Sequence, residues 1–244
     1  MRDYYYDLHI HSCLSPCGDD DSTPDSIAGM GEINGLDIMA LTDHNSCKNC
    51  PAFFEAALRH GILPIAGMEL TTSEDIHTVC LFPDLESALR FDAELQQKRI
   101  LIPNRTDIFG NQLICDSEDN IIGEDEFLLS NATTLSIEEV PALVENFGGI
   151  CYPAHIDRPS NSVSAVLGVF PEFPHFNCAE VHDREKLEEF AEFSKLPEEK
   201  LVICSDAHFL WDIKEKCDCI TLPNIPEGSL DAGKYIIEFL KEKP

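Results

Sequence analysis

Two histidines near the start of the chain, His9 and His11, follow an aromatic and apolar run, Tyr4–Tyr6. Side chains at positions i and i+2 of a β-strand point to the same side, so both imidazoles reach one place. Neutral imidazole is a good ligand for zinc, iron and manganese. A single pair of this kind is weak evidence, because many such pairs face solvent, so its meaning depends on other residues.

Further along the chain, short apolar runs predict buried strands, and histidines or carboxylates lie at their ends. These residues are His44, Glu69, His77, His155, Asp206 and His208. A lone buried histidine is more often only hydrogen-bonded. Six histidines and two carboxylates at predicted strand ends are difficult to explain one by one, so we expect them to surround one metal-binding cavity.

The apolar runs alternate with helical segments, which predicts an α/β fold with a parallel sheet. Carboxyl ends of parallel strands share one face, where functional residues usually lie. His77 begins its run, so that strand is antiparallel or its limits are misjudged. Helix starts are predicted at Thr23, as an N-cap before Pro24, at Asp84, and at the capping box Ser136–Glu139.

Residues 98–135 break this alternation. Two short apolar runs, Gln112–Ile114 and Asn120–Ile122, flank an acidic turn and predict a hairpin insertion. The insertion either lies over the site and selects substrates or is a solvated decoration, and the sequence leaves both interpretations open.

Composition limits the possible partners. The 244 residues carry 45 acidic and 17 basic residues, a net charge of −28. Binding of long nucleic acid usually needs a basic face, so we expect a small anionic substrate and no long nucleic acid. Without a run of about 18 apolar residues or a signal-peptide pattern, we expect no membrane association and a cytoplasmic location. The oligomeric state is not predicted.

The chain has eleven cysteines, among them Cys13, Cys17, Cys47 and Cys50. An odd number without a secretion signal argues against a disulfide framework. Ordinary reduced thiols are the favoured interpretation, with metal binding or redox sensing as the alternative.

Five motifs, in order, resemble those of the PHP (polymerase and histidinol phosphatase) family. They are His9-Ile10-His11, Thr42-Asp43-His44-Asn45, Gly67-Met68-Glu69 with His77, Pro153-Ala154-His155, and Ser205-Asp206-Ala207-His208. The resemblance implies a distorted (β/α)7 barrel that forms a single domain over residues 1–244, with 98–135 inserted in it.

The resemblance also implies two or three divalent ions, which would be zinc, manganese or iron. The first ion would take His9, His11, Glu69 and Asp206, and the second would share Glu69 and add His77 and His155. The third would take His44 and His208, with a last ligand that the family usually places soon after the first motif. This chain has Pro16 and Cys17 there, so either Cys17 or one of Asp19 to Asp21 ligates, or the third site is weak or empty. Asp43 is expected to orient an imidazole.

The activity implied is hydrolysis of a phosphate ester by metal-bound hydroxide. Glu69, Asp206 and His208 would be catalytic, with the leaving-group proton coming from His208 or from a metal-bound water. Arg158 is the main candidate for phosphate binding, followed by Arg184 and His182. The sole tryptophan, Trp211, is expected to pack rather than to stack on a substrate.

A small phosphomonoester, such as a nucleotide, sugar phosphate or histidinol phosphate, is the favoured substrate. One alternative is a 5′-3′ exonuclease or phosphodiesterase acting on short oligonucleotides. The other is a non-catalytic metal or redox sensor that uses the four cysteines named above.

Overall fold

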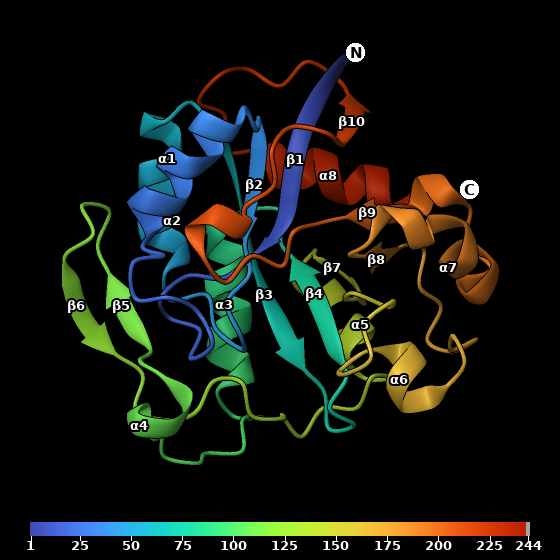
Figure 1. Cartoon of the computed structure of the whole chain (residues 1–244), viewed down its shortest axis with the longest axis horizontal. Helices are drawn as coiled ribbons and strands as arrows, with labels where there is room; N and C mark the ends of the chain where they lie inside the picture. Colours follow the sequence, from blue (N-terminus) through green and yellow to red (C-terminus); the bar gives the residue numbers. More distant parts are fainter. Residues whose placement is uncertain (243–244) are drawn as a thin grey trace.

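A six-stranded mixed sheet organises the computed structural model, which describes residues 1–242 (Figure 1). In spatial order its strands are β10 (Cys219–Leu222), β1 (Arg2–Ile10), β2 (Ile38–Leu41), β3 (Leu63–Thr71), β4 (His77–Leu81) and β7 (Ile150–Pro153). Strands β1, β2 and β3 are parallel, whereas β4 is antiparallel to both β3 and β7. The connection between β3 and β4 is too short for a crossover helix, which explains why His77 begins its strand.

Two further strands, β8 (Ala179–Val181) and β9 (Leu201–Ile203), form a parallel pair near the carboxyl ends of β7 and β1. Ile156 N donates to Glu180 O at 2.8 Å, and Ile10 forms a single parallel bridge with Ala207. The sheet therefore curls into a half-barrel. The α/β class is confirmed, but the hydrogen-bonded ladders do not give the seven-stranded count that the resemblance implies.

Helices and apolar side chains cover both faces of the curled sheet. The helices are α1 (Pro24–Asn34), α2 (Cys50–Arg59), α3 (Leu85–Leu95), α4 (Thr106–Phe109), α5 (Val140–Glu145), α6 (Val163–Leu167), α7 (Leu187–Ser194) and α8 (Ala232–Lys241). Alternate residues of β2 show how the core divides: Met39 and Leu41 pack in the cluster that includes α1, α2 and α3, whereas Ile38 and Ala40 pack in the cluster that includes α8. This period of two fixes which face each strand residue occupies.

Residues 98–135 contain an antiparallel hairpin, β5 (Leu113–Cys115) and β6 (Ile121–Glu124), at the left of Figure 1. The hairpin packs against the loop that follows β1, where Leu113 N donates to Cys13 O at 2.8 Å. It also caps α1, because Asp119 Oδ1 accepts from Asp25 N at 2.8 Å. Thr23 was the predicted cap, but its side chain makes no capping hydrogen bond in the described structure and instead donates to the carboxylate of Asp119.

Of the two other predicted helix starts, the one at Asp84 is confirmed, whereas α5 begins at Val140, four residues after Ser136. Asp84 accepts from Ser87 N at 2.8 Å at the start of α3, and Glu139 accepts from Ser136 N at 2.9 Å before α5. Within residues 1–242, every helix is too short or too polar to cross a bilayer.

Candidate metal centre

The carboxyl end of β1 brings His9 and His11 together, as their spacing predicts. Their Nε2 atoms are 3.1 Å apart, and both side chains are fully buried. The pairing register between β1 and β2 shifts between Asp7 and Ile10, so this end of the strand departs from a regular ladder. Such irregularities often lie next to active sites, where they redirect side chains.

The outer nitrogens of these two rings have partners that fix their tautomers. His9 Nδ1 lies 3.0 Å from both carboxylate oxygens of Glu180, and because a carboxylate only accepts, His9 Nδ1 carries the proton. Ser15 Oγ donates to Asp43 Oδ1 at 2.7 Å, so it accepts from His11 Nδ1 at 2.9 Å. When the rings are neutral, each therefore turns an unprotonated Nε2 towards the same point, which is the arrangement that a metal ligand requires.

Glu69, at the end of β3, lies at the centre of the cluster. The nitrogen atoms nearest to its carboxylate are His77 Nδ1 at 2.8 Å, His44 Nδ1 and His155 Nε2 at 3.0 Å, His11 Nε2 at 3.3 Å and His9 Nε2 at 3.4 Å. Burial alone would raise the pKa of Glu69, but the surrounding imidazoles, led by His77, hold that pKa well below its ordinary value. The carboxylate is therefore charged and can serve two ions at once.

Asp206 completes the first group of ligands. Its Oδ1 lies 3.1 Å from His11 Nε2 and 3.2 Å from His9 Nε2. Burial alone would raise the pKa of Asp206, but His9 and His11 lower it. The backbone φ of Asp206 is +49°, and that of His155 is +29°. Non-glycine residues rarely adopt such angles, and strained backbone of this kind concentrates at functional sites.

The residues at this position fit a cation. Ligand atoms of His9, His11, Glu69 and Asp206 lie within 4.8 Å of one another and are buried. Two unprotonated Nε2 atoms at 3.1 Å repel each other unless positive charge lies between them. Burial alone would lower the pKa of His9, but the carboxylates around it, led by Glu180, raise that pKa well above its ordinary value, which shows that positive charge is favoured here.

Two neighbouring groups of potential ligands adjoin the first. One contains His44, Glu69 and His77, and the other contains His11, His44 and His208. His44 Nδ1 is buried and makes no hydrogen bond of good geometry among residues 1–242, although Glu69 Oε2 lies 3.0 Å away, so this nitrogen can serve as a ligand. His155 Nε2 faces Glu69, as expected for the second ion, but His44 lies at the junction of both groups rather than in the third alone.

Cys17 lies beside His44 and His208, where the sequence places a ligand for the third ion. Desolvation alone would raise the pKa of Cys17, but the charge of His44 and a hydrogen bond with His208 lower it to about 5. A thiolate is the form that binds metal. Its neighbours in the chain, Asp19 to Asp21, lie in the turn that follows.

The cluster of candidate ligands adjoins two spaces that share Arg158, Asp206 and His208. A cavity of about 90 Å³ is lined by His44, Glu69, His77, His155, Arg158, Ser160, Asn161, Asp206 and His208. A groove of about 550 Å³ is lined by Cys17, Arg158, His182, Ser205, Asp206, His208, Phe209 and Asp212. Arg158 lines both spaces, and its Nη1 lies 2.7 Å from Asp206 Oδ2.

Two of the three predicted phosphate-binding residues lie at the groove, and the third does not. Arg158 Nη2 lies 3.3 Å from His182 Nδ1, so these two side chains meet at the groove. Arg184 does not reach it. Its guanidinium pairs with Asp218 and lines another hollow, between β9 and β10.

Comparison with known proteins identifies the family to which this chain belongs. The family model described as "PHP domain" matches residues 7–146, which is more than half of the chain. The chain belongs to the PHP domain family.

Similar proteins differ in their names and in their lengths. An error-prone DNA polymerase from Symbiobacterium thermophilum is 36% identical over 74 residues, which cover 30% of this chain and 7% of the polymerase. A protein from Bifidobacterium adolescentis that is described as a metal-dependent phosphoesterase has a TM-score of 0.53 at 18% identity. The match covers 83% of this chain and 87% of the Bifidobacterium chain. The lesion-specific endonuclease Q from Pyrococcus furiosus has a TM-score of 0.57 at 18% identity, over 86% of this chain and 49% of the endonuclease.

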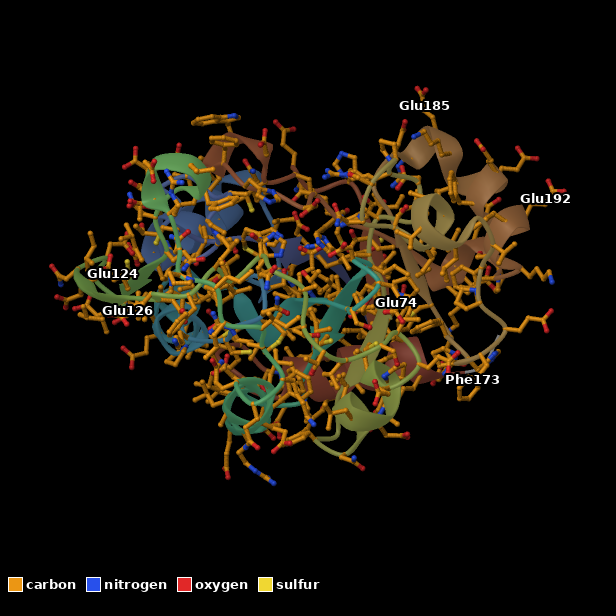
Figure 2. All side chains as sticks on the ribbon, turned by 90° about the horizontal axis from the view of Figure 1, so that it is seen from below. Glu74, Glu124, Glu126, Phe173, Glu185 and Glu192 are labelled. Carbon is orange, nitrogen blue, oxygen red and sulfur yellow. The ribbon has the colours of Figure 1, made fainter. Side chains whose placement is uncertain are left out.

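The expectation that long nucleic acid is not a partner is wrong for this fold. Endonuclease Q has been solved with a 27-mer duplex substrate, and that structure has a TM-score of 0.56 at 17% identity over 86% of this chain and 50% of that one. Net charge describes the whole surface, whereas phosphate binding depends on the local field, which cations in a pocket can reverse. Figure 2 shows Glu124, Glu126, Glu185 and Glu192 projecting outward at the edge of the molecule.

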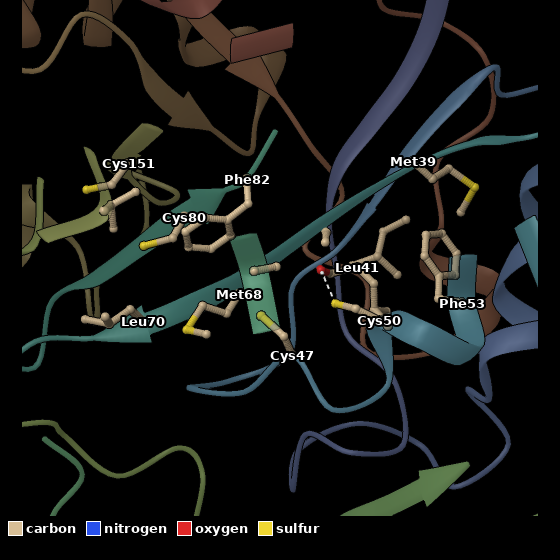
Figure 3. Close-up of a cluster of buried hydrophobic side chains, with 14 of the residues drawn as sticks. Met39, Leu41, Cys47, Cys50, Phe53, Met68, Leu70, Cys80, Phe82 and Cys151 are labelled. Atoms are coloured by element: carbon tan, nitrogen blue, oxygen red, sulfur yellow. Dashed lines mark hydrogen bonds between the residues drawn. The ribbon is translucent and has the colours of Figure 1, made fainter. Parts of the chain in front are cut away.

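Two cysteines of this PHP domain lie away from the metal cluster. Cys47 and Cys50 are buried among apolar side chains such as Met68 and Phe53 (Figure 3). Cys50 Sγ lies 3.8 Å from Leu41 O, and burial raises the pKa of Cys47 well above its ordinary value. This environment is typical of structural thiols, the interpretation that the sequence favoured, and not of metal ligands or redox sensors.

Proposed function

We propose that this PHP domain hydrolyses a phosphate ester with the help of two or three divalent ions, and that a phosphomonoester is the favoured substrate. The observation that carries the proposal is that His9 Nε2 and His11 Nε2 lie 3.2 Å and 3.1 Å from Asp206 Oδ1, while the Nδ1 atom of each ring is held by another side chain. Bound divalent ions lower the pKa of water and neutralise phosphate oxygens. The described residues hold the charges that such ions require.

We assign the ligands from these contacts. His9, His11, Glu69 and Asp206 would hold the first ion, with Glu69 shared by a second ion that His77, His155 and His44 would complete. His208 Nδ1 donates to Asp206 O at 2.8 Å, so Nε2 is the ring atom that remains to bind an ion. This arrangement suits a ligand of a third ion, with His44 and Cys17, better than a proton donor. We therefore propose that water, and not His208, protonates the leaving group.

Arg158 is the residue that we propose to position the phosphate. Its side chain is 35% exposed and lies where the cavity meets the groove. Its planar guanidinium can donate two parallel hydrogen bonds to phosphate oxygens. The pairing with Asp206 holds that plane in place, and His182 supports its other edge.

A phosphodiester is the second candidate substrate. The groove is about 550 Å³, whereas the cavity beside the ligands is about 90 Å³, so the larger space can take a substituent on a second phosphate oxygen. The occurrence of this fold in endonuclease Q also supports the phosphodiester candidate. Comparison of p-nitrophenyl phosphate with bis-p-nitrophenyl phosphate separates the two candidates.

We further propose that residues 1–244 form one PHP domain, with 98–135 as an insertion. Both hydrophobic clusters share the strands of the one curled sheet, whereas β5 and β6 pair only with each other among the described strands.

The test combines metal content with activity. Protein stripped of metal and reloaded with Mn²⁺ should hydrolyse p-nitrophenyl phosphate. Glu69→Gln should reduce turnover by more than about 100-fold, because loss of even an outer partner of a ligand costs 10–100-fold. Glu124→Gln, an exposed change on β6, is the matched control and should retain activity.

Two results would overturn the proposal. One is full turnover by the Glu69→Gln protein. The other is failure of the wild-type protein, supplied with manganese, iron or zinc, to cleave any phosphomonoester, phosphodiester or oligonucleotide.

A further inference from the structure

Two aromatic side chains directly after His208 are stacked on each other and exposed. The ring centroids of Phe209 and Trp211 are 4.9 Å apart, and the rings are inclined by only 17°. Trp211 is 74% exposed and Phe209 is 37% exposed. The expectation that Trp211 packs in the protein is therefore wrong, because the residue lies on a turn that directs it outward.

The turn that carries this pair is anchored on its other side. Residues Leu210–Asp212 form a short 3-10 helix, in which Asp212 N donates to Phe209 O at 3.0 Å. Ile213 is 3% exposed, and its carbonyl accepts from Asn34 Nδ2 at 2.8 Å. Leu210 packs against the main hydrophobic cluster. Inward-facing neighbours thus fix the backbone, and the two aromatic rings are held in place before any ligand arrives.

Phe209 is the member of the pair that reaches the candidate metal centre, and Trp211 stacks on its ring. Phe209 lines the same groove as Arg158, Asp206 and His208. A phosphate bound at the metal centre and Arg158 would extend its organic substituent into this groove. Among the residues that line this groove, Phe209 is the one large apolar side chain, and stacking on its flat ring favours a planar ring over a sugar or an alkyl chain.

We propose that Phe209 and Trp211 form a stacking platform for the nucleobase of the substrate, so that the substrate class is a nucleotide. This inference rests on the proposed function, because it assumes that the phosphate lies at the metal centre. Stacking tolerates every base, since each has a π-face, so the platform selects nucleotides as a class and does not distinguish one base from another.

The first experiment measures kcat/KM for a nucleotide relative to the same phosphate without a base. The manganese-loaded protein is assayed with adenosine 5′-monophosphate and with ribose 5-phosphate. Removal of an aromatic partner of a stacked base costs roughly 5- to 150-fold. Trp211→Ala should therefore lower the ratio of the two kcat/KM values by that factor, and Trp211→Phe should restore most of it.

A matched control comes from an exposed aromatic residue outside the groove. Phe173 is 70% exposed, is labelled at the edge of Figure 2 and is not among the groove-lining residues. Phe173→Ala removes a similar exposed aromatic ring, and the ratio should remain that of the wild-type protein. A purely structural effect of Trp211→Ala would lower both kcat/KM values together and leave their ratio unchanged, which would overturn the proposal.

The second experiment does not depend on turnover. Trp211 is the sole tryptophan, so tryptophan fluorescence reports on this position alone. Adenosine 5′-phosphorothioate should quench it, whereas ribose 5-phosphate should not. If wild-type protein hydrolyses both phosphates with equal kcat/KM and neither ligand quenches Trp211, the platform is refuted while the proposed hydrolysis stands. If hydrolysis fails but the nucleotide analogue alone quenches Trp211, the proposed function fails and base binding is supported.

Discussion

The buried carboxylate of Glu180 gives a sharp test of how the first ion is held. Both of its oxygens lie 3.0 Å from His9 Nδ1, and Oε1 also accepts from His155 N at 3.2 Å. Glu180 is fully buried, so water cannot replace these contacts. It therefore fixes the tautomer and the orientation of His9 without touching the ion itself.

The perturbation is Glu180→Gln, which keeps the shape of the side chain and removes its charge. Glutamine would place an NH2 group at one of the two oxygen positions, where it faces the protonated His9 Nδ1. If its oxygen keeps the bonds at the Oε1 position, two donors oppose each other 3.0 Å apart at the Oε2 position. Loss of such a partner weakens metal binding by about 10–100-fold, or about 1.4–2.8 kcal/mol.

The assay is a titration of the metal-free protein with Zn²⁺ against a competing chelator, which yields Kd without any enzyme activity. The control is Glu185→Gln, an exposed change four residues beyond the end of β8, close to Glu180 in the chain. It removes the same charge from the protein and should leave Kd within about threefold of the wild-type value. Circular dichroism of the metal-free variants checks that both are folded.

The reasoning is refuted if Glu180→Gln binds the first Zn²⁺ as tightly as Glu185→Gln does. That result would mean that the geometry of β1 alone orients His9. A decrease of the same size in both variants would show a long-range charge effect instead of a local hydrogen bond.

Two other predictions concern stability. Replacing Asp119, which caps α1 from the hairpin and has φ +62°, with Gly should cost about 1–2 kcal/mol and lower Tm by about 2–8 °C, and Ala should cost more because of the backbone angle. Equal Tm values for Asp119→Gly and the neighbouring exposed variant Glu118→Ala would contradict the capping role. In the metal-free protein the raised pKa of His9 contributes to the free energy of unfolding in full below about pH 6.5, and this contribution is lost at higher pH. The lowered pKa of Glu69 contributes in full above about pH 4.3, and that contribution is lost at lower pH. Thermal unfolding of that protein should show its highest Tm between these limits, and a Tm that keeps rising above pH 7 would disprove the linkage.

The convergence of the candidate ligands could be predicted from the sequence because strand periodicity and the direction of parallel strands are local rules. His9 and His11 needed only the period of two, and Glu69 and Asp206 needed only their place after apolar runs. The structure brings all four within one group. Position along a strand decides such a site more than any long-range contact does.

The residues that the sequence analysis missed depend on contacts between distant segments. Glu180 also follows an apolar run, which was the signal available, but its partner His9 is 171 residues away. Asp43 was expected to orient an imidazole, and it does so only through Ser15, which no spacing rule connects to it. Arg184 lies in the turn after β8, and its guanidinium forms an ion pair with Asp218, 34 residues further along the chain.

The contacts of residues 98–135 indicate a third role beside the two that the sequence left open, which were covering the site and being a solvated decoration. Gly110 packs so closely on Pro16 O that an added Cβ would lie 2.3 Å from that oxygen, so only glycine fits there. Asn111 Nδ2 donates to Asp20 Oδ2 at 2.7 Å on the far side of the same loop. The segment thus holds both sides of the loop that carries Cys17. That position would let the segment support the loop that carries Cys17. If a third ion binds as proposed, substitutions at Gly110 or Asn111 should act on it through the backbone of residues 12–20 and not through contact with substrate.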